Sequence, residues 1–241
     1  RRPAHWLFYL GLFIIGWLPV FNSPYAHYLI IMMPVWAVIA AVSLDSLGER
    51  LALLAGRTHW GSRVVVILAA LAVVSLCWPA RDYYFLSPAG IVAKRYGPAN
   101  PFVESPHIAG RIRELTGPQD KIFIAGSEPQ ILFYAKRRGV SRFGGVYGLM
   151  MDQPRALEFQ RELISELEKE RPKVIVAVMT PTSWLCQPTS PTFFVDHLEK
   201  MLKEQYVLLG GTVRTGSQAR WEEPLRPEDR PDSKLLLYRR K

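Results

Sequence analysis

The chain has 241 residues, enough for one large or two small domains, and carries a formal net charge of +9. Its charges are unevenly spread. Residues 1–80 contain five basic and two acidic residues, whereas residues 81–241 contain 25 basic and 19 acidic residues. This asymmetry excludes a soluble composition for the first third of the chain. The two cysteines, Cys77 and Cys186, and the five scattered histidines show no metal-ligand spacing, so we expect no disulfide framework, no metal and no cofactor.

Three uncharged apolar runs predict three transmembrane helices, over residues 6–21, 27–44 and 64–80. Each run approaches the roughly 20 residues that a helix needs to cross a bilayer. Buried core helices are one alternative, but the runs have almost no polar face. A secretory signal over residues 1–21 is another, although this segment lacks an A-x-A-like cleavage site. Because the chain starts with Arg1 and not Met, we interpret it as the C-terminal piece of a longer protein, or as a processed one.

The basic residues of the first third predict how these helices are oriented. They lie before the first run and between the second and third, at Arg1, Arg2, Arg50, Arg57 and Arg63, whereas the loop over residues 22–26 has none. The positive-inside rule then places the amino end in the cytoplasm and the rest of the chain after the third helix outside it. We therefore expect an integral protein of a bacterial inner or plasma membrane with an extracytoplasmic domain. Nucleic acid is disfavoured as a partner for such a domain.

Residues 81–106 are rich in aromatic residues, Pro and Gly and predict a linker close to the membrane. From residue 107 onward, apolar helical and strand patterns alternate. We expect helices over residues 105–115, 129–138, 154–170 and 193–203, and strands over residues 121–125, 173–178, 206–209 and 234–238. This order predicts a small α/β domain over residues 107–241 with a largely parallel sheet. The polar, Pro-rich segment 214–233 is expected to be a mobile loop.

The segment "AGSEPQILFYAKRRGVSRF" (125–143) is the densest in chemically active side chains. Glu128 follows a predicted strand, and the carboxyl ends of parallel strands usually present functional groups. Lys136, Arg137, Arg138 and Arg142 follow as a basic cluster. One interpretation is a helix cap with a solvated, basic last turn. The other is a basic patch that faces anionic lipid headgroups or a lipid phosphate.

His27 and Tyr28 stand at the predicted outer end of the second apolar run, without a charge beside them. Aromatic rings with a polar tip are favoured at the depth of the lipid headgroups, so this pair suits an interfacial anchor. The pair also suits a polar contact to a lipid-linked phosphate or sugar that arrives from the bilayer. The sequence leaves both interpretations open.

Two segments resemble GT-C-type membrane glycosyltransferases, a superfamily that includes the aminoarabinose transferase of lipid A and protein O-mannosyltransferases. The segment "PYAHYLIIMMPVWAVIAA" (24–41) resembles a late membrane segment of the family, with Pro34 at its proline position. The segment "IRELTGPQDKIFIAGSEPQILFYAKRRGVSRF" (112–143) resembles the opening of the family's outer α/β domain.

This resemblance implies transfer of a sugar from a polyprenyl-phosphate donor to a lipid, glycan or protein acceptor, with membrane lipids as surroundings. It also implies that the catalytic carboxylate lies in an earlier outer loop, so no residue of this chain is assigned as catalytic. His27, Tyr28, Glu128 and Arg142 are the candidates for substrate contact. Two alternatives remain: a membrane-anchored binding or scaffold protein without catalysis, and an enzyme of the outer domain that uses Glu128.

Overall fold

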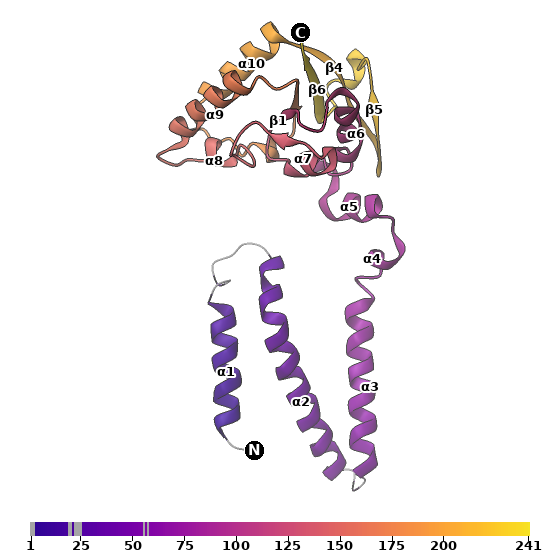
Figure 1. The fold of residues 1–241 in the computed structure, drawn as a ribbon. Coiled ribbons are helices and arrows are strands. Elements are labelled where there is room, and N and C mark those ends of the chain that lie inside the picture. Colours follow the sequence, from indigo (N-terminus) through magenta and orange to yellow (C-terminus); the bar gives the residue numbers. More distant parts are fainter. Residues whose placement is uncertain (1–2, 19–20, 22–25, 55, 57) are drawn as a thin grey trace. The chain divides into compact units, whose positions relative to one another are not determined.

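The computed structural model describes residues 3–18, 21, 26–54, 56 and 58–241 (Figure 1). The chain forms two compact units, Arg1–Tyr84 and Phe85–Lys241, here called the N-terminal and C-terminal units. The N-terminal unit contains α1 (Pro3–Trp17), the 3-10 helix η1 (Ala26–Met32), α2 (Met33–Leu54) and α3 (Thr58–Cys77).

Helices α2 and α3 approach each other closely at two glycines. A Cβ atom on Gly61 would lie 2.5 Å from the carbonyl oxygen of Gly48 and 2.7 Å from Cβ of Ala52. No larger side chain fits there without moving a backbone. Small residues of this kind allow helix backbones to pack when apolar surface on the outside cannot drive the association.

The expectation of three membrane spans is wrong. Among the described residues, one helix, Leu29–Leu54, is both long and apolar enough to cross a membrane. Leu7–Trp17 and Arg63–Cys77 are shorter apolar helices. At 1.5 Å per residue these apolar stretches of α1 and α3 would extend about 16 Å and about 22 Å, less than the roughly 30 Å of a hydrocarbon core. The helix α2 also continues past residue 44, where the sequence pattern predicted a loop, because nothing in "LDSLGERLALL" breaks a helix.

Short helices form where the sequence predicted a linker. The helix α4 (Asp82–Phe85) crosses the boundary between the two units, and the C-terminal unit continues with α5 (Pro88–Tyr96) and the 3-10 helix η2 (Gly97–Ala99). The side chain of Ser87 caps α5 by accepting a hydrogen bond from the backbone N–H of Gly90 at 3.2 Å, and Pro88 occupies the first turn. Helix α6 (Ser105–Leu115) then leads into the sheet.

The sheet has six strands in the order β2-β1-β3-β6-β4-β5. Their bounds are β1 (Lys121–Ala125), β2 (Arg138–Gly139), β3 (Val174–Val178), β4 (Tyr206–Thr215), β5 (Gln218–Glu222) and β6 (Leu235–Arg240). The strand β1 pairs in parallel with β2 and β3, whereas β6 is antiparallel to both of its neighbours and β5 is antiparallel to β4.

The expected α/β domain is therefore present, but its sheet is mixed and not largely parallel. The strands β4 and β5 form a hairpin whose turn contains Gly216 at a φ of 61°, a conformation that favours glycine. The chain then returns to insert β6 between β3 and β4. The segment predicted as a mobile loop, 214–233, thus contains β5 and the 3-10 helix η4 (Pro227–Asp229).

Helices cover both faces of the sheet. Alternate residues of β1 point to opposite faces: Ile122 and Ile124 pack with α6 and α7 (Pro129–Ala135), whereas Phe123 and Ala125 pack with α9 (Ala156–Glu170) and α10 (Phe193–Gln205). The short helices α8 (Tyr147–Met150) and η3 (Pro181–Ser183) follow the loops between these elements. Both faces are buried, which explains why β1 and β3 read as continuous apolar runs.

The structure shortens one predicted helix. The sequence pattern extended the helix from residue 129 to 138, but α7 ends at Ala135. Lys136 adopts a left-handed conformation with φ of 53°, and its N–H bonds back to the carbonyls of Leu132 and Phe133. Arg138 then enters β2 and pairs with Lys121.

Candidate functional site

Polar side chains gather at one edge of the sheet. The strands β1, β3 and β4 run in the same direction and β6 runs opposite, so three carboxyl ends and one amino end meet there. Each of these ends brings a polar residue, and the start of α6 brings one more. We call this group the carboxyl-edge cluster; it consists of Glu104, Glu128, Ser183, Arg214 and Lys234. Such an edge is where α/β sheets usually bind ligands.

Glu128 lies directly after β1 and is 4% exposed. The side-chain amide of Gln130 donates a hydrogen bond to Oε2 of Glu128 at 2.5 Å, and Ser183 also bonds to this carboxyl group. Burial raises the pKa of Glu128 above its ordinary value, and the neighbouring carboxylate of Glu104 raises it further, against the two hydrogen bonds. The side chain of Glu128 does not cap α7, although the residue holds the N-cap position.

Glu104 and Lys234 add two further charges to the cluster. Glu104 is completely buried, and neither of its carboxylate oxygens has a hydrogen-bond partner among the described residues. The nearest cation is Arg214, whose guanidinium nitrogen lies 3.7 Å from Oε1 of Glu104. Burial lowers the pKa of the Lys234 ammonium group, although Glu104 opposes this shift. The cluster therefore buries charges of both signs close together, with Arg214 as the ion-pair partner of Glu104.

The same residues attach the segment that precedes α6 to the sheet. Arg214 donates a hydrogen bond to the carbonyl of Gly97 at 3.2 Å, and the hydroxyl of Thr182 donates one to the carbonyl of Ala99 at 3.2 Å. Within the C-terminal unit, these bonds fix residues 97–104 against the carboxyl ends of β3 and β4. The sequence distance between Gly97 and Arg214 made this attachment impossible to predict from local patterns.

Two serines join the loops at this edge. The backbone N–H of Ser127 donates to the hydroxyl of Ser183 at 2.7 Å. The hydroxyl of Ser127 in turn accepts hydrogen bonds from the N–H groups of Val146 and Tyr147, at 2.9 and 3.2 Å. Gly145 is required beside them, because a Cβ atom there would lie 2.9 Å from Cα of Ser127. The loops after β1, β2 and β3 are thus held together at one point.

A mainly apolar groove opens beside the cluster, between the sheet and α10. We call it the Trp184 groove; its cavity volume is about 730 Å³, and its walls include Met179, Trp184, Leu185, Val195, Leu202 and Tyr238. Trp184 is fixed by a hydrogen bond from its indole nitrogen to the carbonyl of Val178 at 2.7 Å. Its neighbour Ser183 belongs to the carboxyl-edge cluster. Besides the hydroxyl of Tyr238, the few polar side chains of the wall are Thr182, Cys186 and Glu199.

The groove and the cluster differ in what they can do. A ligand pocket of a few hundred cubic ångströms with apolar walls and a few polar groups is typical of a binding site for small molecules. By contrast, the carboxyl groups of Glu104 and Glu128 are buried, and that of Glu128 is bound by Gln130. The cluster therefore connects segments of the domain to one another, and the Trp184 groove is the part of this edge that can accept a ligand.

The other predicted site residues lie elsewhere. Arg142 forms two bonds to the carboxylate of Glu162 on α9, of which the one to Oε2 measures 2.8 Å, and its guanidinium lies 4.4 Å from the ring centre of Phe143. The guanidinium lowers the pKa of Glu162. The structure thus brings Arg142 to α9 and not to the carboxyl-edge cluster. His27 and Tyr28 belong to η1 of the N-terminal unit, and their side chains lie outside the described residues.

Sequence reasoning missed most of the cluster and the groove. Thr180 and Ser183 follow the predicted strand 173–178 in the same way that Glu128 follows its strand, so the same rule could have found them. No comparable signal marked Glu104 or Arg214, because both fell in segments read as a linker and a loop.

Across the described part of the chain, no group of three or more His, Cys, Asp or Glu side chains could hold a metal ion. Cys77 and Cys186 are free thiols. No family model matches the chain, and neither a curated protein nor a solved structure matches it.

Proposed function

We propose that the chain is the C-terminal portion of an integral-membrane glycosyltransferase that moves a sugar from a polyprenyl-phosphate donor to a lipid, glycan or protein acceptor. In this proposal the helix Leu29–Leu54 lies in the membrane and the C-terminal unit lies outside the cytoplasm. The Trp184 groove is the observation that carries the proposal. A substrate with a long apolar chain needs apolar walls, and this groove supplies them on a water-exposed domain.

The groove suits an isoprenoid chain better than a free sugar. Sugars are bound through many hydrogen bonds, whereas the walls offer few polar groups, on Thr182, Cys186, Glu199 and the hydroxyl of Tyr238. Each buried methylene group contributes about 0.8 kcal/mol, so a few isoprene units in the groove would give useful affinity. The two segments that resemble GT-C-type transferases, 24–41 and 112–143, give further support. The catalytic carboxylate, by the same proposal, lies outside this chain.

A membrane-anchored binding protein without catalysis is the second candidate. It is favoured by the burial of both carboxyl groups of the cluster, which leaves neither of them open to a substrate in the groove. The two candidates differ in one measurable respect. Only the transferase moves a sugar, whereas both bind an apolar chain in the groove.

The decisive experiment uses the full-length native protein in membranes, supplied with a polyprenyl-phosphate-linked sugar. Met179, which is 57% exposed in the groove wall, is replaced in Met179→Gln. We expect the KM for the donor to rise roughly five- to tenfold with kcat unchanged, because the variant loses about 1 kcal/mol or more of apolar contact. The control is Met151→Gln, which is 45% exposed and lies outside the groove. It is expected to leave the KM unchanged.

Three outcomes separate the candidates. Transfer with a selective effect of Met179→Gln supports the proposal. Lipid binding that Met179→Gln weakens, without any sugar transfer by the full-length protein, points to the binding protein. Equal effects of the two methionine variants would remove the groove from either role.

The location of the C-terminal unit can be tested with Cys186, an exposed thiol at the groove. In a Cys77→Ser background, a membrane-impermeant thiol reagent should label Cys186 in intact cells. Labelling that requires lysis would place the domain in the cytoplasm and refute the extracytoplasmic part of the proposal.

A further inference from the structure

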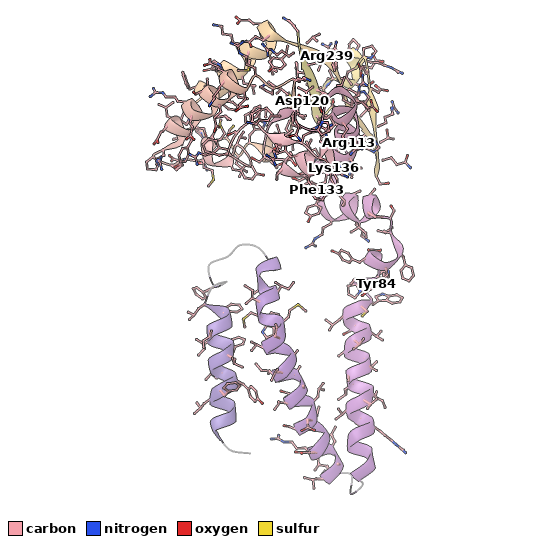
Figure 2. All side chains as sticks on the ribbon, viewed as in Figure 1. Tyr84, Arg113, Asp120, Phe133, Lys136 and Arg239 are labelled. Carbon is pink, nitrogen blue, oxygen red and sulfur yellow. The ribbon has the colours of Figure 1, made fainter. Side chains whose placement is uncertain are left out.

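A second surface of the C-terminal unit collects positive charge. At the C-terminal ends of α6 and α7, four cations and two exposed aromatic rings surround a shallow cavity of about 720 Å³. We call it the α7 surface; it consists of Arg113, Phe133, Tyr134, Lys136, Arg137 and Arg138. Figure 2 shows Arg113, Phe133 and Lys136 close together on this side of the domain. The cavity wall contains no acidic residue.

Two of the cations are fixed by backbone carbonyls. Arg137 donates hydrogen bonds to the carbonyl and hydroxyl of Thr116, at 2.6 and 2.9 Å, and to the carbonyl of Ala135 at 3.2 Å. Arg113 donates to the carbonyl of Tyr134 at 2.6 Å. Helix C-termini carry partial negative charge, so these bonds hold the guanidinium groups without cancelling their full charge.

The other two cations have no internal partner. Lys136 and Arg138 are exposed, and in the described part of the chain their side chains form neither an ion pair nor a hydrogen bond. Several other exposed cations of this unit are paired with carboxylates, as in Lys121–Glu170, Arg142–Glu162, Arg155–Glu158 and Lys173–Asp120. Lys136 and Arg138 instead lie together beside a cavity whose wall contains no acidic residue, and positive charge concentrated in this way attracts an external anion.

The aromatic rings indicate which anion fits. Phe133 is 79% exposed and Tyr134 is 41% exposed, and their ring centres lie 5.7 Å apart. A free phosphate ion would satisfy the cations but would leave the Phe133 ring in water. A bilayer surface satisfies both, since aromatic rings favour the headgroup boundary and anionic lipids attract Lys and Arg.

We propose that the α7 surface docks on anionic phospholipid headgroups, with the Phe133 ring in the headgroup boundary and Lys136 and Arg138 beside the phosphates. The inference uses the proposed function only in that a membrane is near the domain. An acidic protein and a soluble anion are the competing occupants, and the experiment separates them.

The full chain is reconstituted in nanodiscs of phosphatidylcholine, with or without phosphatidylglycerol, and amide hydrogen exchange is followed over residues 129–139. We expect the anionic lipid to slow exchange in this segment. The double variant Lys136→Gln, Arg138→Gln should weaken docking roughly 25-fold, since each charge near an anionic surface accounts for about fivefold. Its control is Lys169→Gln, Lys200→Gln, which should behave as wild type. These two lysines lie exposed on α9 and α10 and form no ion pair with any residue that the structure describes.

Phe133→Ser tests the role of the ring. It keeps all four charges, and it should still weaken docking to the anionic discs. If only the charge variant has an effect while Phe133→Ser behaves as wild type, the surface binds a soluble anion or an acidic partner, and the proposal is overturned. Protection by inorganic phosphate in discs of phosphatidylcholine alone would overturn it in the same way.

Exchange rates that do not depend on the lipid would also overturn the proposal. Failure of the chain to remain in nanodiscs is a different result, because it refutes the proposed membrane location of Leu29–Leu54. In that case flotation of the chain with vesicles of the same two compositions decides the docking question. Binding to the anionic vesicles alone supports the α7 surface, and binding to neither refutes it.

Discussion

Arg137 holds the ends of α6 and α7 together, and its removal should loosen this face of the sheet. Its guanidinium bonds to the carbonyl and hydroxyl of Thr116 at 2.6 and 2.9 Å, and to the carbonyls of Ala135 and Lys136 at 3.2 and 3.1 Å. Thr116 is buried, so Arg137→Ala leaves its carbonyl without the donor that satisfies it. The perturbation therefore combines lost hydrogen bonds with an unpaired buried acceptor.

The structure gives the size of this effect. Hydrogen bonds from a charged donor are worth about 1.5–3 kcal/mol each when buried, and two of these bonds are short. Because Arg137 is partly exposed, we reduce the sum to about 2 kcal/mol of unfolding free energy for the variant. That value corresponds to roughly 30-fold faster opening of the region.

Native-state hydrogen exchange of the detergent-solubilised chain measures this directly at the amides of β1 and α7. Arg138→Ala is the matched control, since Arg138 is the next residue and makes no internal side-chain bond among the described residues. It should change exchange by less than about twofold. The reasoning fails if Arg138→Ala has as large an effect as Arg137→Ala, or if Arg137→Ala changes exchange by less than about threefold.

Two further predictions concern the carboxyl-edge cluster. Burial raises the folded-state pKa of Glu128 above its ordinary value of 4.5, so the folded chain binds the carboxyl proton more tightly than the unfolded chain. Proton binding therefore contributes to the free energy of unfolding in full below pH 4.5. This contribution is lost as pH rises through the folded-state pKa. Glu128→Gln should therefore gain stability relative to wild type as pH rises above 4.5 in a thermal unfolding series, and parallel curves would contradict the assignment. Arg214→Met leaves the buried carboxylate of Glu104 with Lys234 as its remaining cation, and should cost about 3 kcal/mol by chemical denaturation. Adding Glu104→Gln should recover at least half of that loss, and no recovery would show that Arg214 acts through its bond to Gly97 instead.

Local patterns in the sequence determined most of the secondary structure of the C-terminal unit. The runs "KIFIA" and "KVIVAV" predict β1 and the residues of β3, because apolar and β-branched residues without polar alternation suit strands buried on both faces. The helical spacing of Leu163 and Leu167 predicts α9, whose buried face contains both. The rule that functional groups follow parallel strands placed Glu128 at the correct edge of the sheet.

Tertiary structure decided what depends on residues far apart in the chain. Strand pairing set β6 antiparallel between β3 and β4, an order that no local pattern encodes, and it brought Lys234 to the same edge as Glu128. Arg142 could not be judged from sequence, because its availability depends on Glu162. The number of apolar runs was visible in the sequence, but the lengths of their helices were not, since these depend on where the backbone hydrogen bonds stop. Sequence thus determined the buried strands β1 and β3 and the amphipathic helix α9, but not β2 or β5. Packing determined which charges meet and which remain free, because this depends on distances in space and not along the chain.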